Sequence, residues 1–173
     1  MIMRVIGIDP GTHRCGYAVV DGAGSKFTIQ RYGIFNTQEK NKNIAAAERL
    51  CKIRQGLCAL IETYMPNALS IERLFINNNF KTAVSVGEAR GVVLVSAFER
   101  GIEIAEYTPQ QIKSALTGNG AAPKGQLAQM VKLLTGLTEI PEPDDAADAI
   151  ACAICHLQTA PFLSATKKHA IFN

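Results

Sequence analysis

The sequence contains no apolar run long enough to cross a membrane. The best candidate, Gly91 to Phe98, stops at Glu99, whereas a membrane-spanning helix needs about 20 apolar residues. We also expect no signal peptide, because Asp9 interrupts the short apolar stretch near the N-terminus. Internal repeats and low-complexity tracts are absent as well. These absences argue against membrane proteins and favour an ordinary globular chain.

The sequence also offers little basis for disulfide bonds. It has five cysteines, an odd number, and they lie within apolar patterns rather than at loop spacings, which favours a reduced, cytoplasmic protein. Cys152 and Cys155 form a Cys-x-x-Cys pair, but no second pair completes a zinc site and the spacing is helical. The net charge of +3 is mild, so it permits nucleic-acid binding without requiring it.

Length and composition favour one soluble domain. The chain has 173 residues, of which 47% are hydrophobic and 19% charged, and a chain of this size can bury a core of its own. We expect a single domain over residues 1–160. Because Pro161 interrupts the last helical pattern, we expect residues 161–173 to form a flexible tail.

The hydrophobic pattern predicts an α/β protein. Short β-branched runs predict strands, and apolar residues at helical spacing predict helices. Cys51 and Cys58 lie seven residues apart on one predicted helix, and we interpret them as packing residues. We expect His156 near the exposed end of the last helix. The predicted strands cover residues 5–8, 16–20, 27–37, 68–72 and 102–107, and the predicted helices cover residues 44–64, 82–100, 109–116, 124–134 and 144–158.

Acidic residues carry the chemical signal. Asp9 and Glu72 each end an apolar strand, and Asp145 and Asp148 are three residues apart at a helix start, so both lie on one helix face. For Asp145 a capping role is the simpler alternative, and we interpret Asp144 as a helix cap. Capping explains Asp148 poorly, because it lies a turn further into an almost purely apolar helix.

Carboxylates drawn together repel one another, so such a group persists where cations neutralise it. Ligands that are all oxygen favour Mg²⁺, for which Mn²⁺ can substitute, over zinc. Two such ions about 4 Å apart can clamp the attacking and leaving oxygens of a phosphodiester. The acids therefore favour phosphoryl transfer to water.

Four segments in order resemble the RuvC family of Holliday-junction resolvases. They are Gly7-Ile-Asp-Pro-Gly-Thr12 with the following Gly16-Tyr17, Ile71-Glu-Arg-Leu-Phe75, Gly87-Glu-Ala-Arg-Gly91 and Asp145-Ala-Ala-Asp148. The resemblance covers the chain from Arg4 to His156. It implies a ribonuclease-H-like fold, with a five-stranded mixed sheet flanked by helices, and a homodimer that cleaves four-way junction DNA by paired symmetric nicks. It also implies a branch-migration partner of the RuvAB kind.

The same resemblance assigns roles to individual residues. It makes Asp9, Glu72, Asp145 and Asp148 a tetrad of catalytic, metal-binding acids. Lys113 and Lys124 match lysines near the scissile phosphate, although solvated lysines are the plain alternative. Phe75 matches an aromatic residue that stacks on a base at the junction centre, and its alternative is a core position. Arg73 is a candidate DNA contact at a position where family members vary.

Two other functions match parts of the sequence. A junction-binding protein that does not cleave would share the fold, and one incubation of a synthetic junction with Mg²⁺ separates it from a nuclease. The Asp9-Pro-Gly-Thr12 turn alone also suggests an actin-like ATPase or sugar kinase. Those proteins need a duplicated domain, for which 173 residues leave no room.

Overall fold

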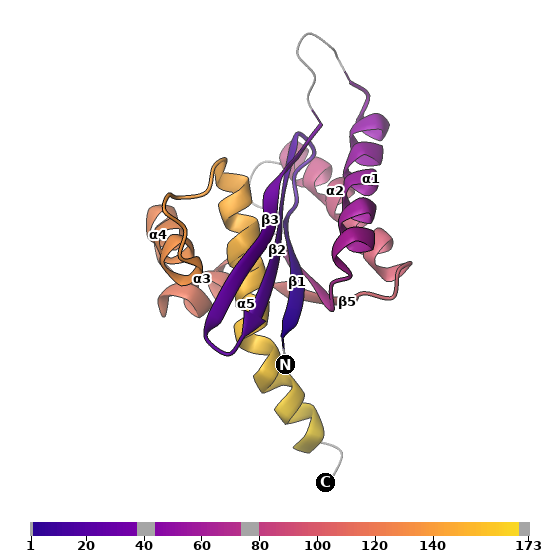
Figure 1. The fold of residues 1–173 in the computed structure, drawn as a ribbon. Helices are drawn as coiled ribbons and strands as arrows, with labels where there is room; N and C mark the ends of the chain where they lie inside the picture. The colour runs from indigo at the N-terminus through magenta and orange to yellow at the C-terminus, as the bar shows by residue number, and fades with distance from the viewer. Residues whose placement is uncertain (1, 38–43, 74–79, 170–173) are drawn as a thin grey trace.

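The computed structural model describes residues 2–37, 44–73 and 80–169. It has a central five-stranded sheet with helices on both faces (Figure 1). The strands are β1 (Met3–Asp9), β2 (Arg14–Ala23), β3 (Lys26–Asn36), β4 (Ala68–Glu72) and β5 (Glu103–Tyr107). The helices are α1 (Ala46–Tyr64), α2 (Phe80–Phe98), α3 (Pro109–Thr117), α4 (Lys124–Thr135) and α5 (Asp144–His169).

The sheet is mixed, in the order β3-β2-β1-β4-β5. β1 pairs antiparallel with β2, and β2 with β3, so the N-terminal segment forms a meander. β4 lies parallel to β1 and β5 parallel to β4, which requires crossover helices between them. The predicted α/β class and the predicted five-stranded mixed sheet are confirmed, and β1 is the central strand.

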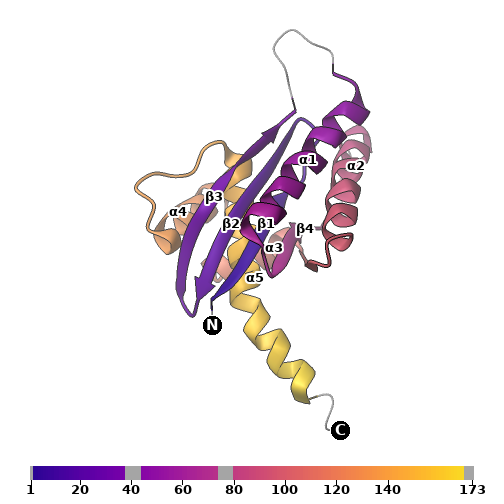
Figure 2. The same ribbon diagram turned by 45° about the vertical axis from the view of Figure 1, so that its right-hand side comes forward.

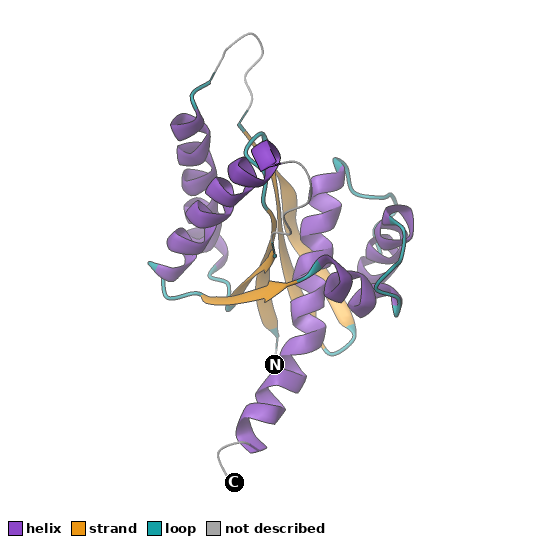
Figure 3. Ribbon diagram, turned by 180° about the vertical axis from the view of Figure 1, so that it is seen from behind, coloured by secondary structure: helices purple, strands orange, loops and turns teal. Residues whose placement is uncertain are grey.

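Helices cover the sheet unequally. α1 and α2 lie on one face, and α3, α4 and α5 lie on the other (Figures 2 and 3). Each face has its own apolar core: Ile6, Ile8 and Leu69 belong to the core with α1 and α2, whereas Val5 and Val20 belong to the core with α5. This alternation along β1 follows from the opposite directions of successive side chains in a strand.

α5 lies close against the sheet because the strands beneath it carry glycine. A Cβ atom on Gly7 would overlap the Ala149 carbonyl oxygen and lie 2.7 Å from the Ala153 nitrogen, and one on Gly16 would overlap the Asp145 carbonyl. Only glycine leaves room for this approach. Since α5 begins at Asp144, the contact holds its first turns over the end of β1.

Three expectations about the helices are wrong. We predicted that the last helix ends near Gln158, yet α5 continues through Pro161 to His169. A proline removes one backbone hydrogen bond, and the long helix anchored on the sheet continues past it. The division into a domain over residues 1–160 and a tail over residues 161–173 stays a prediction. Cys51 is exposed rather than packed, and His156 is buried rather than near an exposed end.

Candidate active site

The predicted acids converge at one edge of the sheet. Asp9 ends β1 and Glu72 ends the neighbouring parallel strand β4, with Ile8 paired to Ile71 one position earlier. Parallel strands end at the same edge, so these two carboxylates are neighbours in the sheet. Asp145 and Asp148, three residues apart, project from the first turns of α5 over the same edge.

The ionisation of Asp9 shows how closely the acids interact. Burial, and then the charges of Asp148, Glu72 and Asp145, raise the pKa of Asp9 from 3.8 to about 7. Burial also raises the pKa of Glu72 and of Asp148, and the Asp148 charge adds to the shift of Glu72. The charges of neighbouring acids therefore make the ionised forms of Asp9, Glu72 and Asp148 less stable, as expected for a group that needs a cation.

Two lysines face these acids across a pocket of about 180 Å³, which Glu72, Lys113, Lys124 and Asp148 line together with apolar side chains. Lys124 Nζ lies 3.1 Å from Asp148 Oδ2 and 3.3 Å from Asp144 Oδ2. Burial lowers the pKa of Lys124, but its contacts with these two acids raise it above the ordinary value overall. Lys113 and Lys124 each lower the pKa of Glu72.

Asp144 and Asp145 differ in their surroundings. Asp144 is the first residue of α5, one position inside the cap that we assigned to it, and its exposed carboxylate contacts Lys124. Asp145 lies 3.5 Å from Arg14 Nε through its Oδ2 atom. That oxygen is nevertheless buried and accepts no hydrogen bond from any residue that the structure describes, so it has capacity for a further ligand. The sequence did not indicate Arg14.

The ligand atoms that these residues offer suit a hard metal ion. Four carboxylates at one edge supply only hard oxygen ligands, and one of their oxygens is buried with no hydrogen-bond partner among the described residues. Within the described ranges, no three His, Cys, Asp or Glu side chains are already arranged around a common metal position. The acids would therefore have to draw closer around a cation, which their mutual repulsion opposes in its absence.

None of the remaining candidates that the structure describes lines the pocket beside the acids. Arg73 Nε lies 3.4 Å from Glu106 Oε2, and Phe75 falls outside the described residues. Cys152 and Cys155 are buried in the core on α5. His156, which sequence reasoning placed wrongly, accepts or donates a hydrogen bond through Nδ1 to the Tyr107 hydroxyl at 2.9 Å. A polar group buried in this way needs such a partner, which no sequence pattern revealed.

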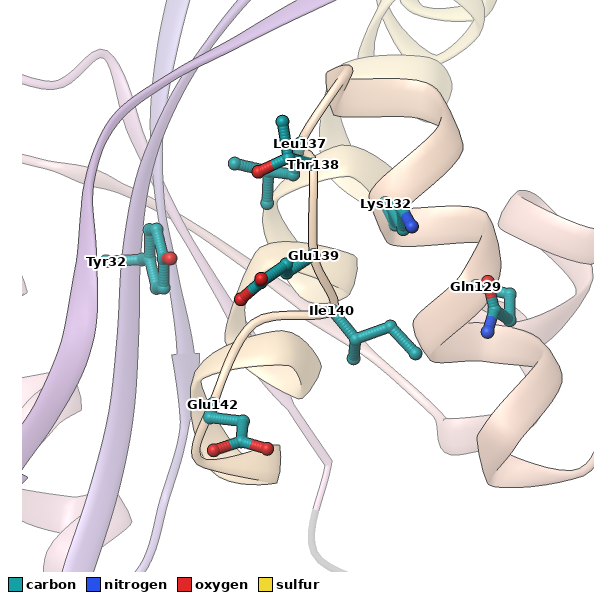
Figure 4. Close-up of a pocket in the computed structure, with 8 residues that line it drawn as sticks. All are labelled: Tyr32, Gln129, Lys132, Leu137, Thr138, Glu139, Ile140 and Glu142. Carbon is teal, nitrogen blue, oxygen red and sulfur yellow. The ribbon is translucent and has the colours of Figure 1, made fainter.

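A larger cavity, of about 650 Å³, lies apart from the acids. It is bounded by Tyr32 of β3, Gln129 and Lys132 of α4, and the segment that leads from α4 to α5 (Figure 4). That segment contributes Glu139 and Glu142 to the lining. None of the tetrad acids lines it, so it is separate from the candidate active site.

The fold and the site together define a class of protein. A five-stranded mixed sheet in this order, with a helix carrying acids over the end of its central strand, is a ribonuclease-H-like fold. No helix in the part of the chain that the structure describes meets the length and hydropathy of a membrane span.

Comparison with known proteins identifies the family. The model of the family crossover junction endodeoxyribonuclease RuvC matches residues 5–156. The crossover junction endodeoxyribonuclease RuvC of Caldicellulosiruptor saccharolyticus is 45% identical over 156 residues, covering 90% of this chain and 92% of that protein. The crossover junction endodeoxyribonuclease RuvC of Brevibacillus brevis is 44% identical over 162 residues, covering 94% of this chain and 96% of that protein. The structure of Thermus thermophilus RuvC in complex with a Holliday junction substrate matches with a TM-score of 0.85 at 35% identity, covering 92% of this chain and 96% of that one.

The chain belongs to the RuvC family of crossover junction endodeoxyribonucleases.

Proposed function

We propose that this protein is a Mg²⁺-dependent endonuclease that resolves four-way DNA junctions by paired symmetric nicks during recombination and repair. The observation that carries the proposal is the convergence of four acids: Asp9 and Glu72 end neighbouring parallel strands, and Asp145 and Asp148 lie in the first turns of α5. Burial, and then the charges of the other three acids, raise the pKa of Asp9 to about 7. Such a group of partly buried acids is costly without a cation and suits a metal-dependent nuclease. The relatives named above are crossover junction endodeoxyribonucleases.

Asp9, Glu72, Asp145 and Asp148 would hold the metal ions, and Mg²⁺ suits their hard oxygen atoms, with Mn²⁺ as a substitute. Bound ions would stabilise the charge that develops on the phosphate and promote attack by water. Lys113 and Lys124 line the same pocket as Glu72 and Asp148, and we propose that their ammonium groups bind the scissile phosphate. Phe75 is proposed to stack on a base at the junction centre, and Arg73 to contact DNA.

We propose that the protein acts as a homodimer through α2. Val84, Val95 and Phe98 are exposed on this helix, and their spacing with Gly87 and Gly91 places all five on one side. A Cβ atom on Gly91 would meet nothing within 4 Å, so a second helix could approach closely there. Small residues on this side of α2 favour such an approach, and we include Ala83, next to Val84, in the proposed contact with Gly87 and Gly91. Two-fold symmetry supplies the two sites that paired nicks need.

The dimer is tested by sedimentation at micromolar concentration. We expect a dimer for the wild-type protein and a monomer for Val95→Glu, which places a charge on the exposed side of α2. A monomeric wild-type protein that still cuts both strands in concert would contradict the proposal.

The remaining partners follow from the family. A branch-migration complex of the RuvAB kind would deliver the junction, and the cytoplasm, where DNA is accessible, would be the site of action. All five cysteines are free thiols, which suits a reducing compartment.

Incubation with a synthetic four-way junction tests the function. We expect two symmetric nicks in the presence of Mg²⁺, none in EDTA, and none in a linear duplex of the same sequence. Binding of the junction without nicks at any metal concentration would instead support a junction-binding protein that does not cleave.

A further inference from the structure

Two arginines share one carboxylate beside the candidate active site. Arg90 Nη2 of α2 lies 2.8 Å from Glu106 Oε2, and Arg73 Nε lies 3.4 Å from the same oxygen. We call these three residues the Glu106 cluster. They come from α2, from β5 and from the residue directly after β4, so the cluster joins three parts of the fold at one point.

The Glu106 cluster lies at the same sheet edge as the acids but on the other face. The Arg73 amide donates a 2.8 Å hydrogen bond to the Tyr107 carbonyl, so Arg73 extends the pairing of β4 with β5 by one residue. Successive side chains in paired strands point to opposite faces. Glu72 and Tyr107 accordingly face α3 and α5, where Tyr107 contacts His156, and Arg73 and Glu106 face α2, where Glu106 contacts Arg90.

The two arginines are held differently. The Arg90 side chain is 15% exposed and makes the short contact, whereas the Arg73 side chain is 59% exposed and makes the long one. Arg90 Nη1 is also buried and has no hydrogen-bond partner among the described residues. Glu106 is therefore engaged chiefly by Arg90, and most of the donor groups of Arg73 face solvent.

The charges of the Glu106 cluster do not cancel. Two guanidinium groups and one carboxylate leave one positive charge in excess, and the exposed arginine carries it outward. A guanidinium group with free N–H donors matches the oxygens of a phosphate. Contacts of this kind position a protein on DNA and do not depend on base sequence.

We propose that Arg73 binds a backbone phosphate of the junction strand that crosses this sheet edge from the acidic site toward α2, and that the Arg90–Glu106 pair holds Arg73 in position. This inference rests on the proposed function and specifies the chemical group that Arg73 contacts there and the residues that hold Arg73 in position. The ligand is the phosphodiester group itself, in any sequence.

The chain provides a matched control in Arg54. Its side chain is 53% exposed, and its Nη2 atom lies 3.2 Å from Glu99 Oε2, in an ion pair between α1 and the residue directly after α2. Arg54 thus resembles Arg73 in exposure and pairing but does not lie at the edge where β4 and β5 end. Changing either arginine to glutamine removes one exposed positive charge.

The test measures binding of an immobile four-way junction in EDTA, by fluorescence anisotropy, between 50 and 200 mM salt. Each lost phosphate contact reduces the slope of log affinity against log salt by about 0.9. At 50 mM salt the wild type should bind the junction more tightly than Arg73→Gln. The ratio of the two affinities should fall about 3.5-fold for each bound subunit when the salt is raised fourfold to 200 mM. Arg73→Lys should restore most of the slope, and Arg54→Gln should leave it unchanged.

Three results would overturn the inference. An unchanged slope for Arg73→Gln, with a normal melting temperature, would make the ion pair with Glu106 purely structural. Equal changes for Arg54→Gln and Arg73→Gln would show a general effect of net charge. A loss that depends on the bases at the crossover but not on salt would show a base contact. Binding is measured without metal, so its result does not depend on cleavage. Failure of the wild-type protein to nick junctions would refute the proposed function, but it would not decide whether Arg73 binds a phosphate.

Discussion

Replacing Asp9 by asparagine should stabilise the metal-free protein at neutral and alkaline pH. Asp9 is partly buried at the end of the central strand, and burial, followed by the charges of the other acids, raises its pKa from 3.8 to about 7. A pKa unit corresponds to about 1.4 kcal/mol, so keeping Asp9 ionised above pH 7 costs the folded state about 4 kcal/mol. Asparagine keeps the shape and removes the charge, but its amide must still find hydrogen-bond partners. We therefore expect a net gain of about 1 to 3 kcal/mol.

The direction of the pH dependence follows from the two pKa values. The folded-state pKa of Asp9 lies above the unfolded value, so the proton on Asp9 stabilises the fold. That stabilisation is complete below about pH 4 and is lost as the pH rises through 7. Asp9→Asn has no titrating group at this position, so it does not lose this stability as the pH rises. The difference in stability between the variant and the wild type should therefore be greatest above pH 7 and shrink toward pH 4.

Thermal melting in EDTA at pH 4, 6 and 8 measures this difference, with and without added Mg²⁺. For a chain of this length, about 2 kcal/mol corresponds to a rise of roughly 4 to 8 °C. Mg²⁺ should raise the melting temperature of the wild type more than that of the variant, because the variant lacks one ligand. Asp144→Asn is the control, since its side chain is 76% exposed and should matter little. An Asp9→Asn protein that melts at or below the wild type in EDTA at pH 8 would refute the reasoning.

Three further predictions concern the site and its support. Asp148→Asn should bind junctions in EDTA at least as tightly as the wild type, melt no lower without metal and fail to nick; poor binding and a much lower melting temperature would make Asp148 structural. Phe75→Ala should lose cleavage far more than junction binding, because phosphate contacts dominate affinity, and equal losses would favour a core position. Gly7→Ala should destabilise the fold by at least about 2 kcal/mol in denaturant unfolding, because its Cβ would overlap a backbone carbonyl of α5. Gly125→Ala, whose Cβ would meet nothing within 4 Å, should be neutral or slightly stabilising.

The sequence was sufficient to predict the strands, the acids that end two of them and the acids at the start of the last helix, whereas the grouping of the four acids into one tetrad depended on the family resemblance. Asp9 follows a β-branched run and Glu72 a short apolar one, and the spacing of Asp145 and Asp148 gives them a shared helix face. These features are local, so periodicity and strand ends reveal them. The roles of Lys113 and Lys124 depended on the family resemblance, because lysines in short helices are common.

Contacts between distant segments could not be predicted in this way. Arg14 near Asp145, Arg73 and Arg90 around Glu106, and His156 bonded to Tyr107 each join elements far apart in the chain. No local pattern marks the partner in such a pair. The end of α5 was predicted wrongly for a related reason: Pro161 is a local signal for a helix end, whereas packing of the preceding turns on the sheet is not visible in the sequence.

The most direct test of the account maps junction cleavage to the nucleotide for the wild type and Asp9→Asn, with junction binding measured on the same samples. The central claim is that the acids at the sheet edge hold the metal ions for cleavage and do not bind the DNA. We predict paired symmetric nicks by the wild type with Mg²⁺, no nicks by Asp9→Asn, and binding by the variant in EDTA at least as tight as that of the wild type. Cleavage by Asp9→Asn at a rate near that of the wild type would contradict the claim.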